Sequence, residues 1–211
     1  MKYLLIAIFF TQIAFGQDAR FEYGLNLQKA RSYPLEITLG NHSVTMPFRQ
    51  IFRTPIHPAI GVGTEWDWKE KNQHKVFSPL KFGFFYNRYN TFGPYLTLGL
   101  GYRYTHPIGL FADVAAEIGY LHYFRPFAKL VKNGDLYESK YDFGKPSVML
   151  TSLVSVGYDF YQNSELPLSI FVRYLIFAQT PYNDTLSNVL PQAILMIGGR
   201  WTFGEVVRCP K

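Results

Sequence analysis

Several features common in proteins are missing from this chain of 211 residues. It contains a single cysteine, Cys209, so it has no internal disulfide and no cysteine cluster for zinc or iron–sulfur. It has no run of 18 apolar residues, which excludes a transmembrane helix. Charged residues make up only 17% of the chain, against a usual share of about 25%. Its basic residues are scattered and form no nucleic-acid-binding pattern, and no motif indicates a cofactor or a metal.

Aromatic residues are abundant. They make up 18% of the chain, with 16 Tyr, 19 Phe and 3 Trp. Because this content comes without long apolar runs, it favours a β-rich protein over a bundle of membrane helices.

The first residues have the pattern of a secretory signal peptide. Lys2 is followed by an apolar stretch too short to span a bilayer, and Ala14 and Gly16 are the small residues of a cleavage site. The sequence therefore predicts a signal peptide at residues 1–16, with cleavage between Gly16 and Gln17. We expect an N-terminal segment at 17–34, a barrel at 35–203 and a C-terminal tail at 204–211.

Alternation with a period of two residues determines the predicted fold. In the segment 95–104 the even positions are Leu or Tyr, whereas the odd ones include Thr97, two glycines and Arg103. The same division recurs in most candidate strands. The polar face is rich in Gly, Ala and Ser with single charges, which fits a narrow interior better than the outer face of a soluble sandwich. We therefore predict an all-β fold, a closed antiparallel transmembrane β-barrel with lipid outside and a polar lumen inside.

The lumen is expected to hold nearly balanced charges. The interior of an eight-stranded barrel is just wide enough for side chains, so we expect a packed network of ion pairs and not a diffusion pore. The face pattern assigns these residues to the network: Glu65, Asp67, Lys81, Arg103, Asp113, Glu117, Asp159, Arg173 and Arg200.

Aromatic residues at the strand ends predict girdles at both rims, where amphipathic rings meet the boundary between lipid and water. Three strands that run toward one rim are expected to end at Tyr86, Tyr120, and Tyr174 with Phe177. Four strands that run toward the other rim each end in an aromatic pair: Trp66 and Trp68, Tyr102 and Tyr104, Tyr158 and Phe160, and Trp201 and Phe203.

The number of strands follows from the connections. Seven strands are clear between Ala59 and Phe203. Because both chain ends of such barrels face the periplasm, the number of strands is even, and one more strand is expected upstream. The segment 35–48 supplies it, with a change of phase at Gly40–Asn41 that indicates a bulge or turn. Because the segment 21–28 also alternates, a ten-stranded barrel is the alternative to the eight-stranded one.

The segment 124–146 is long and strand-like, with Asn133–Gly134 at its centre, a pair favoured in tight hairpin turns. We expect the two barrel strands to extend into an outer-facing hairpin whose extracellular turn is Asn133–Gly134. The short links at 105–109 and 162–165 then become periplasmic turns.

Several stretches resemble a known group of proteins. The chain is similar to small outer-membrane β-barrel proteins of Bacteroidota, and more generally to the barrels of OmpA and OmpX. The resemblance implies a fold and a location in the cell outer membrane, without a specific activity. The stretches that carry it are IHPAIGVGTE at 56–65, GYLH at 119–122, FVRY at 171–174 and QTP at 179–181.

The expected function is a non-enzymatic structural or interaction role through the extracellular hairpin and loops. The partners would be outer-membrane lipid, lipopolysaccharide and another outer-membrane protein, and no nucleic acid. The alternative is a lipid A or phospholipid-modifying hydrolase or acyltransferase at the rim. Its best candidate is His122, with Glu138 and Ser139 on the facing strand, although the face pattern places His122 toward lipid and opposite Lys145.

The closing strand carries a further pattern. Gly198, Trp201 and Phe203 have the spacing of the C-terminal signal through which the assembly machinery of outer-membrane barrels recognises its substrates. We therefore expect that machinery to be a partner during biogenesis.

Overall fold

The alternating segments form strands in the computed structural model, which describes residues 33–44, 55–71, 73–126, 129–133, 136–140, 143–164, 166–182 and 188–203. Within these ranges no helix has the length and hydrophobicity needed to cross a bilayer. The elements are β1 (Tyr33–Ser43), β2 (Pro58–Lys71), β3 (His74–Tyr86), β4 (Phe92–Thr105), β5 (Leu110–Tyr123), β6 (Lys129–Asn133), β7 (Leu136–Lys140), β8 (Lys145–Asp159), α2 (Tyr161–Ser164), β9 (Leu168–Thr180) and β10 (Leu190–Phe203).

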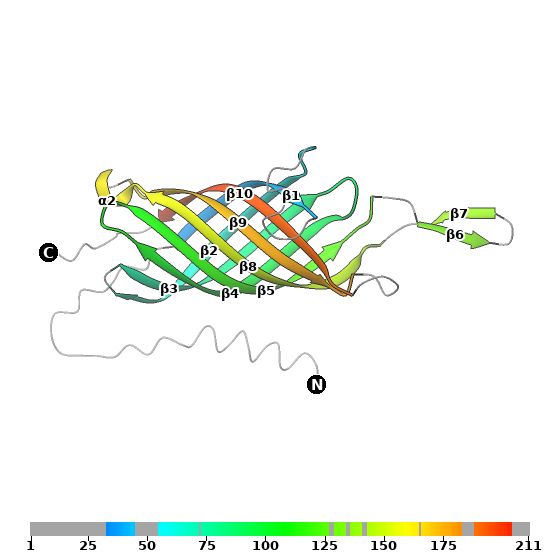
Figure 1. Ribbon diagram of the computed structural model, residues 1–211, viewed down its shortest axis with the longest axis horizontal. Helices are drawn as coiled ribbons and strands as arrows, with labels where there is room; N and C mark the ends of the chain where they lie inside the picture. Colours follow the sequence, from blue (N-terminus) through cyan, green and yellow to red (C-terminus); the bar gives the residue numbers. More distant parts are fainter. Residues whose placement is uncertain are drawn as a thin grey trace, which may run out of the picture. The chain divides into compact units, whose positions relative to one another are not determined.

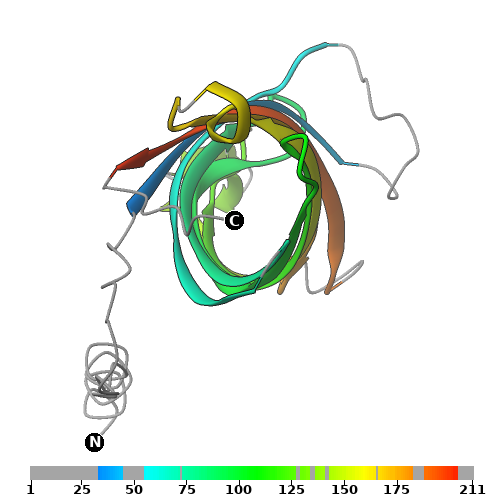
Figure 2. The ribbon, with the colours of Figure 1, turned by 90° about the vertical axis from the view of Figure 1, so that its left-hand side faces the viewer.

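Eight of the strands close into a barrel. The order around it is β1-β10-β9-β8-β5-β4-β3-β2, and β1 pairs with β2 to complete the ring. All neighbours are antiparallel, and the view along the barrel in Figure 2 shows the closed ring. The predicted eight-stranded antiparallel barrel is confirmed. The segment 21–28, on which the ten-stranded alternative depended, lies outside the described residues.

The first strand differs from its prediction. It starts at Tyr33 and ends at Ser43, whereas residues 35–48 were expected. Its pairing with β10 runs without a break from Tyr33 to Ser43, so the bulge predicted at Gly40–Asn41 is wrong. The pattern changes there because the strand is near its end, where neighbouring His42 and Ser43 are both buried. A register shift occurs elsewhere, in the pairing of β2 with β3 between Asp67 and Lys69.

The two ends of the barrel carry different connections (Figure 1). The strands β2, β4, β8 and β10 end at one rim, which we call the α2 rim because α2 follows β8 there. The strands β1, β3, β5 and β9 end at the other. We call it the hairpin rim, because its longest connection contains β6 and β7.

The β6–β7 hairpin is a two-stranded sheet separate from the barrel. The expectation that β5 and β8 extend into it is wrong, because β5 ends at Tyr123 and β8 begins at Lys145. Asn133 ends β6 and pairs with Leu136, whereas Gly134, the other residue of the predicted turn, lies outside the described residues. His122 consequently pairs with Pro146 and not with Lys145.

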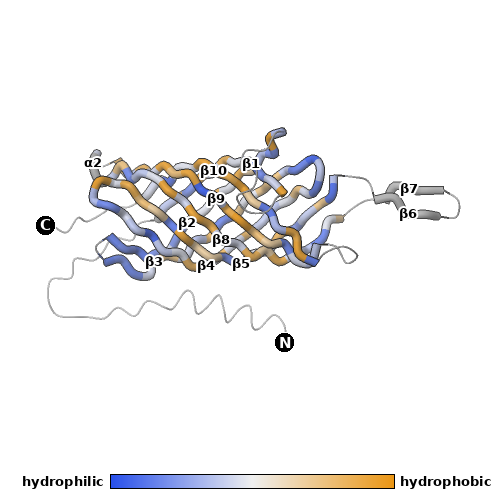
Figure 3. The backbone as a smooth tube through the Cα atoms, in the orientation of Figure 1, coloured by the Kyte–Doolittle hydropathy of each residue, from blue (hydrophilic) through white to orange (hydrophobic). Residues whose placement is uncertain are grey.

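Hydrophobic and hydrophilic residues alternate along the barrel strands (Figure 3), and the outer face is apolar. Outward side chains such as Leu39 and Ile118 are 57% and 59% exposed, whereas buried charged side chains line the inside. Phe177, expected in a girdle, is 1% exposed because it shares the inner face of β9 with Arg173.

Interior glycines make room for aromatic rings. A Cβ on Gly83 would lie 2.4 Å from the Tyr95 ring, and one on Gly198 would lie 2.6 Å from the Phe171 ring. The glycine-rich inner face therefore belongs to a tightly packed interior.

Candidate functional site

The charged interior is centred on Arg103 of β4. Its guanidinium donates to both carboxylate oxygens of Glu65 at 2.8 and 2.9 Å, and to both of Asp113 at 2.7 and 3.0 Å. The Phe77 ring lies 4.7 Å from the Arg103 Cζ atom. Ser155 donates to Asp113 at 3.2 Å. Two bidentate carboxylates and an aromatic face therefore compensate this buried cation.

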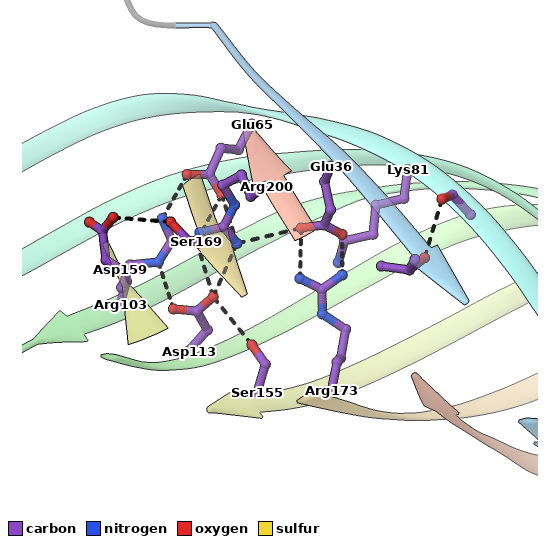
Figure 4. Close-up of polar contacts among 12 residues, drawn as sticks. Glu36, Glu65, Lys81, Arg103, Asp113, Ser155, Asp159, Ser169, Arg173 and Arg200 are labelled. Atoms are coloured by element: carbon purple, nitrogen blue, oxygen red, sulfur yellow. Dashed lines mark hydrogen bonds and ion pairs between the residues drawn. The ribbon is translucent and has the colours of Figure 1, made fainter. Parts of the chain in front are cut away.

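A second bidentate pair lies further into the barrel. Arg173 of β9 donates to both oxygens of Glu36 of β1, at 2.8 Å for the Nη2 bond. These residues are 137 positions apart in the sequence and reach one another across the interior, as Figure 4 shows. Nearby, Lys81 and Thr97 both donate to Glu117, the Thr97 hydroxyl at 2.7 Å.

Arg200 of β10 joins the two pairs into one network (Figure 4). Its Nη2 lies 3.4 Å from Glu36, 3.5 Å from Asp113 and 3.7 Å from Glu65. Its Nε is buried with no hydrogen-bond partner within the described residues. Arg200 is therefore the link that holds carboxylates of three different strands at one level of the barrel.

Seven of the residues assigned to the lumen from the sequence are buried in the barrel. Glu65, Arg103, Asp113, Arg173 and Arg200 belong to this network, and Lys81 and Glu117 form a separate ion pair beside it. Asp67 is exposed near the α2 rim and pairs with Lys75 at 2.7 Å. Asp159 forms no ion pair with any described residue; it accepts from the Ser169 hydroxyl at 3.2 Å near the α2 rim.

Sequence reasoning missed two members of the network. Lys75 bridges Glu65 and Asp67, each at 2.7 Å, and Glu36 holds Arg173. Glu36 and Thr38 are buried and alternate with exposed aliphatic residues of β1. The same period of two residues is visible in the sequence, so it could have placed Glu36 in the interior.

A neutral chain of hydrogen bonds occupies the interior at the hairpin rim, and it was also missed. Asn87 donates to His42 Nδ1 at 3.2 Å, and His42 Nε2 donates to Gln192 at 2.7 Å. Gln192 donates to Gln179 at 2.7 Å, and Gln179 to Ser147 at 3.3 Å. The chain links β1, β8, β9, β10 and the β3–β4 turn, so it fixes the start of that turn against the barrel.

Beside this chain the interior is filled with apolar side chains. The His42 ring stacks on Phe85, with the centroids 4.3 Å apart and the planes 10° from parallel. Phe177, Leu121 and Met149 are buried in the same cluster. At the opposite end, a cavity of about 230 Å³ opens between Glu65, Lys75, Arg103, Asp159 and Arg200, among other residues.

The predicted girdle residues lie around the α2 rim. Trp68 is the most exposed at 72%, and Tyr158 and Phe160 are half-buried with their ring centroids 5.0 Å apart. The remaining members are exposed on the outer face: Trp66, Tyr102, Tyr104, Trp201 and Phe203.

His122, the candidate for lipid hydrolysis, is held by other groups than those expected. Tyr120 donates to its Nδ1 at 2.8 Å, and its Nε2 donates to the Phe143 carbonyl at 3.0 Å. Glu138 and Ser139 pair with Val131 and Leu130 in the separate hairpin. No metal-binding group of three or more His, Cys, Asp or Glu occurs among the described residues.

These features define a closed eight-stranded antiparallel β-barrel with an apolar outer face and a charged interior.

No protein-family model matches the chain, and no curated protein does. Solved structures similar to it include the N-terminal barrel domain of Pseudomonas aeruginosa OprF, at 14% identity over 82% of this chain and 97% of that chain, with a TM-score of 0.47. Neisserial surface protein A is similar at 14% identity over 82% of this chain and 99% of that one, with a TM-score of 0.47. The outer membrane enzyme PagL is similar at 10% identity over 78% and 97%, with a TM-score of 0.43. Such distant likenesses assign no activity to the chain.

Proposed function

We propose that this chain is an integral protein of the bacterial outer membrane, in which a sealed barrel anchors and presents the connections of the hairpin rim to the cell exterior. The observation that carries the proposal is the inverted distribution of side chains. Charged residues such as Arg103 and Glu65 are buried, while Leu100 and Ile197 are 61% and 64% exposed on the outer face. Water disfavours such a surface and lipid favours it.

The strand lengths support the same proposal. The barrel strands have 11 to 15 residues, and a tilted transmembrane strand needs about 9–11. The aromatic residues of the α2 rim lie where an interfacial girdle belongs. This rim would face the periplasm, and the barrel assembly machinery would recognise the end of β10.

The interior supports an anchoring role and not a transport role. The network around Arg103, together with the apolar cluster around Phe85 and Phe177, fills the barrel with side chains that have bonded or packed partners. Opening a path would break buried ion pairs, each of which costs about 3–5 kcal/mol to disrupt from one side. The function therefore lies at the rims and connections of the barrel, and not along its axis.

Two measurements test the proposal. Membrane fractionation is expected to place the full chain in the outer membrane, as a band that migrates differently before and after boiling. Purified barrel in a planar bilayer is expected to leave the conductance at baseline. A soluble chain would overturn the membrane assignment, and stepwise conductance that vanishes in a variant with a blocked interior would overturn the sealed barrel.

A further inference from the structure

The chain that follows β9 turns inward over the mouth of the barrel at the hairpin rim. The Pro181 carbonyl accepts a hydrogen bond of 2.7 Å from Ser147 of β8, and the Tyr182 carbonyl accepts one of 2.9 Å from Tyr123 of β5. Ser147 and Tyr123 are buried and lie on the inner face of their strands. Donors that point inward from two neighbouring strands therefore hold residues 181 and 182 above the interior.

Tyr182 also reaches the far side of this mouth. Its hydroxyl donates to Asn90 Oδ1 at 2.6 Å, and its ring centroid lies 6.2 Å from that of Tyr123. Asn90 belongs to the turn between β3 and β4, and around the ring β8 and β5 separate β9 from β4. The hydrogen bonds of Tyr182 therefore join two connections that start on different sides of the barrel.

The layer beneath Tyr182 is closed to water in this arrangement. Thr91, which follows Asn90 in the chain, is 0% exposed, and its Oγ1 has no hydrogen-bond partner within the described residues. A hydroxyl at an open mouth would be hydrated. At the α2 rim, by contrast, the cavity of about 230 Å³ leads to Arg103 and Arg200. The two ends of the barrel thus differ in how far a small solute can enter.

The same contact is coupled to the neutral hydrogen-bond chain inside the barrel. Because the Pro181 carbonyl can only accept, the Ser147 hydroxyl donates to it and accepts from Gln179 at 3.3 Å. Displacement of residues 181 and 182 would leave the last member of that chain without its acceptor. Groups that lie outside the strand ladder open at a lower free energy than the barrel unfolds, so this cover can open locally.

We propose that Tyr182 is a latch that ties the β9–β10 connection to the β3–β4 turn and closes the barrel mouth at the hairpin rim. In the closed state small solutes enter the interior from the α2 rim only. When the latch opens, the layer of Thr91, Ser147 and Gln179 becomes accessible from the hairpin rim. This inference goes beyond the proposed function, because it concerns a movement of the connections and does not depend on the surrounding membrane.

Alkylation of single cysteines by iodoacetamide tests the proposal in the folded full chain. In detergent both mouths face water, so the two rates can be compared directly. Every variant carries Cys209→Ser, which removes the native thiol. Thr91→Cys places a thiol beneath the latch, and Thr202→Cys places one at a half-buried position that lines the cavity of the α2 rim.

Two tyrosine substitutions are then compared in each cysteine background. Tyr182→Phe removes the hydrogen bond to Asn90 and keeps the ring beside Tyr123. The matched control, Tyr120→Phe, also removes one hydroxyl bond, of 2.8 Å to His122, but on the outer face. A band shifted by boiling shows that each variant is folded.

The thiol of Thr91→Cys is expected to react at least about tenfold more slowly than that of Thr202→Cys, because it reacts only when the latch opens. Tyr182→Phe is expected to raise the rate at position 91 about fivefold, which corresponds to one hydrogen bond of ~1 kcal/mol, and to leave the rate at position 202 unchanged. Tyr120→Phe is expected to change neither rate.

Three results would overturn the latch. Equal rates at positions 91 and 202 without a tyrosine substitution would show an open mouth. An unchanged rate at position 91 in Tyr182→Phe would show that the hydroxyl holds nothing closed. Equal acceleration by Tyr120→Phe would indicate a general loosening of the rim. Each of these results would leave the proposed anchoring function in place, since the ion-pair network below still fills the barrel.

Discussion

Replacing Arg103 with Met tests whether the interior network holds the barrel together. Met preserves much of the apolar stem and removes the guanidinium, so Glu65 and Asp113 lose four hydrogen bonds of 2.7 to 3.0 Å. Both carboxylates stay inside the barrel, where each is at most 5% exposed. The variant therefore keeps buried negative charge while losing its principal counter-charge.

The remaining contacts set the magnitude. Removing one partner of a buried ion pair costs about 3–5 kcal/mol. Glu65 keeps Lys75 at 2.7 Å, and Asp113 keeps the Ser155 hydroxyl at 3.2 Å and Arg200 at 3.5 Å. Because neither carboxylate is left without a partner, we expect a loss of unfolding free energy near the lower end, about 3 kcal/mol.

Urea unfolding of the barrel in phosphatidylcholine vesicles, followed by tryptophan fluorescence, measures this loss. Arg88→Met makes the same chemical change at an exposed position and is expected to alter the stability by less than ~0.5 kcal/mol. Combining Arg103→Met with Asp113→Asn is expected to cost less than the two single losses added together, with a coupling of about 1–3 kcal/mol. Combining it with Glu117→Gln is expected to be close to additive, because Glu117 accepts hydrogen bonds from Lys81 and Thr97 and not from Arg103.

Two results would refute the reasoning. If Arg103→Met destabilises the barrel no more than Arg88→Met does, the network contributes no stability. If Asp113→Asn and Glu117→Gln couple equally to Arg103→Met, the effect is a general loss of interior charge and does not come from the contacts that the structure shows.

Three further predictions concern processing, orientation and assembly. Mass spectrometry of the purified protein is expected to find Gln17 at the N-terminus, and an intact signal segment would contradict cleavage after Gly16. A tag inserted after Gly134 is expected to bind antibody on whole cells, because hairpin tips tolerate insertion; labelling only after permeabilisation would reverse the orientation. Phe203→Ala is expected to lower the amount of assembled, boiling-shifted barrel several-fold more than Tyr104→Ala, since both rings are exposed at the α2 rim but only Phe203 lies in the closing strand. Equal losses would leave an ordinary girdle pair and no assembly signal.

The architecture was accessible from sequence because alternation is a local property. A period of two residues places Arg103 and Gly101 on one face and Tyr102 on the other, whatever the neighbouring strands are. The inward charges followed from the same pattern, and the eighth strand from the even number of strands that such barrels have. The errors arose where the pattern ends, at the boundaries of β1 and at the hairpin, because a strand end depends on the pairing of its neighbours.

The pairings themselves were decided by the tertiary structure. The sequence by itself determined that acids and bases face a common interior, but strand stagger brings Glu36 to Arg173, 137 residues away, and leaves Asp159 with Ser169. It likewise assembles His42, Gln192 and Gln179 into one hydrogen-bonded chain from three strands. Alternation fixes the face on which a side chain lies, whereas its height and partner depend on how all eight strands are offset around the closed ring.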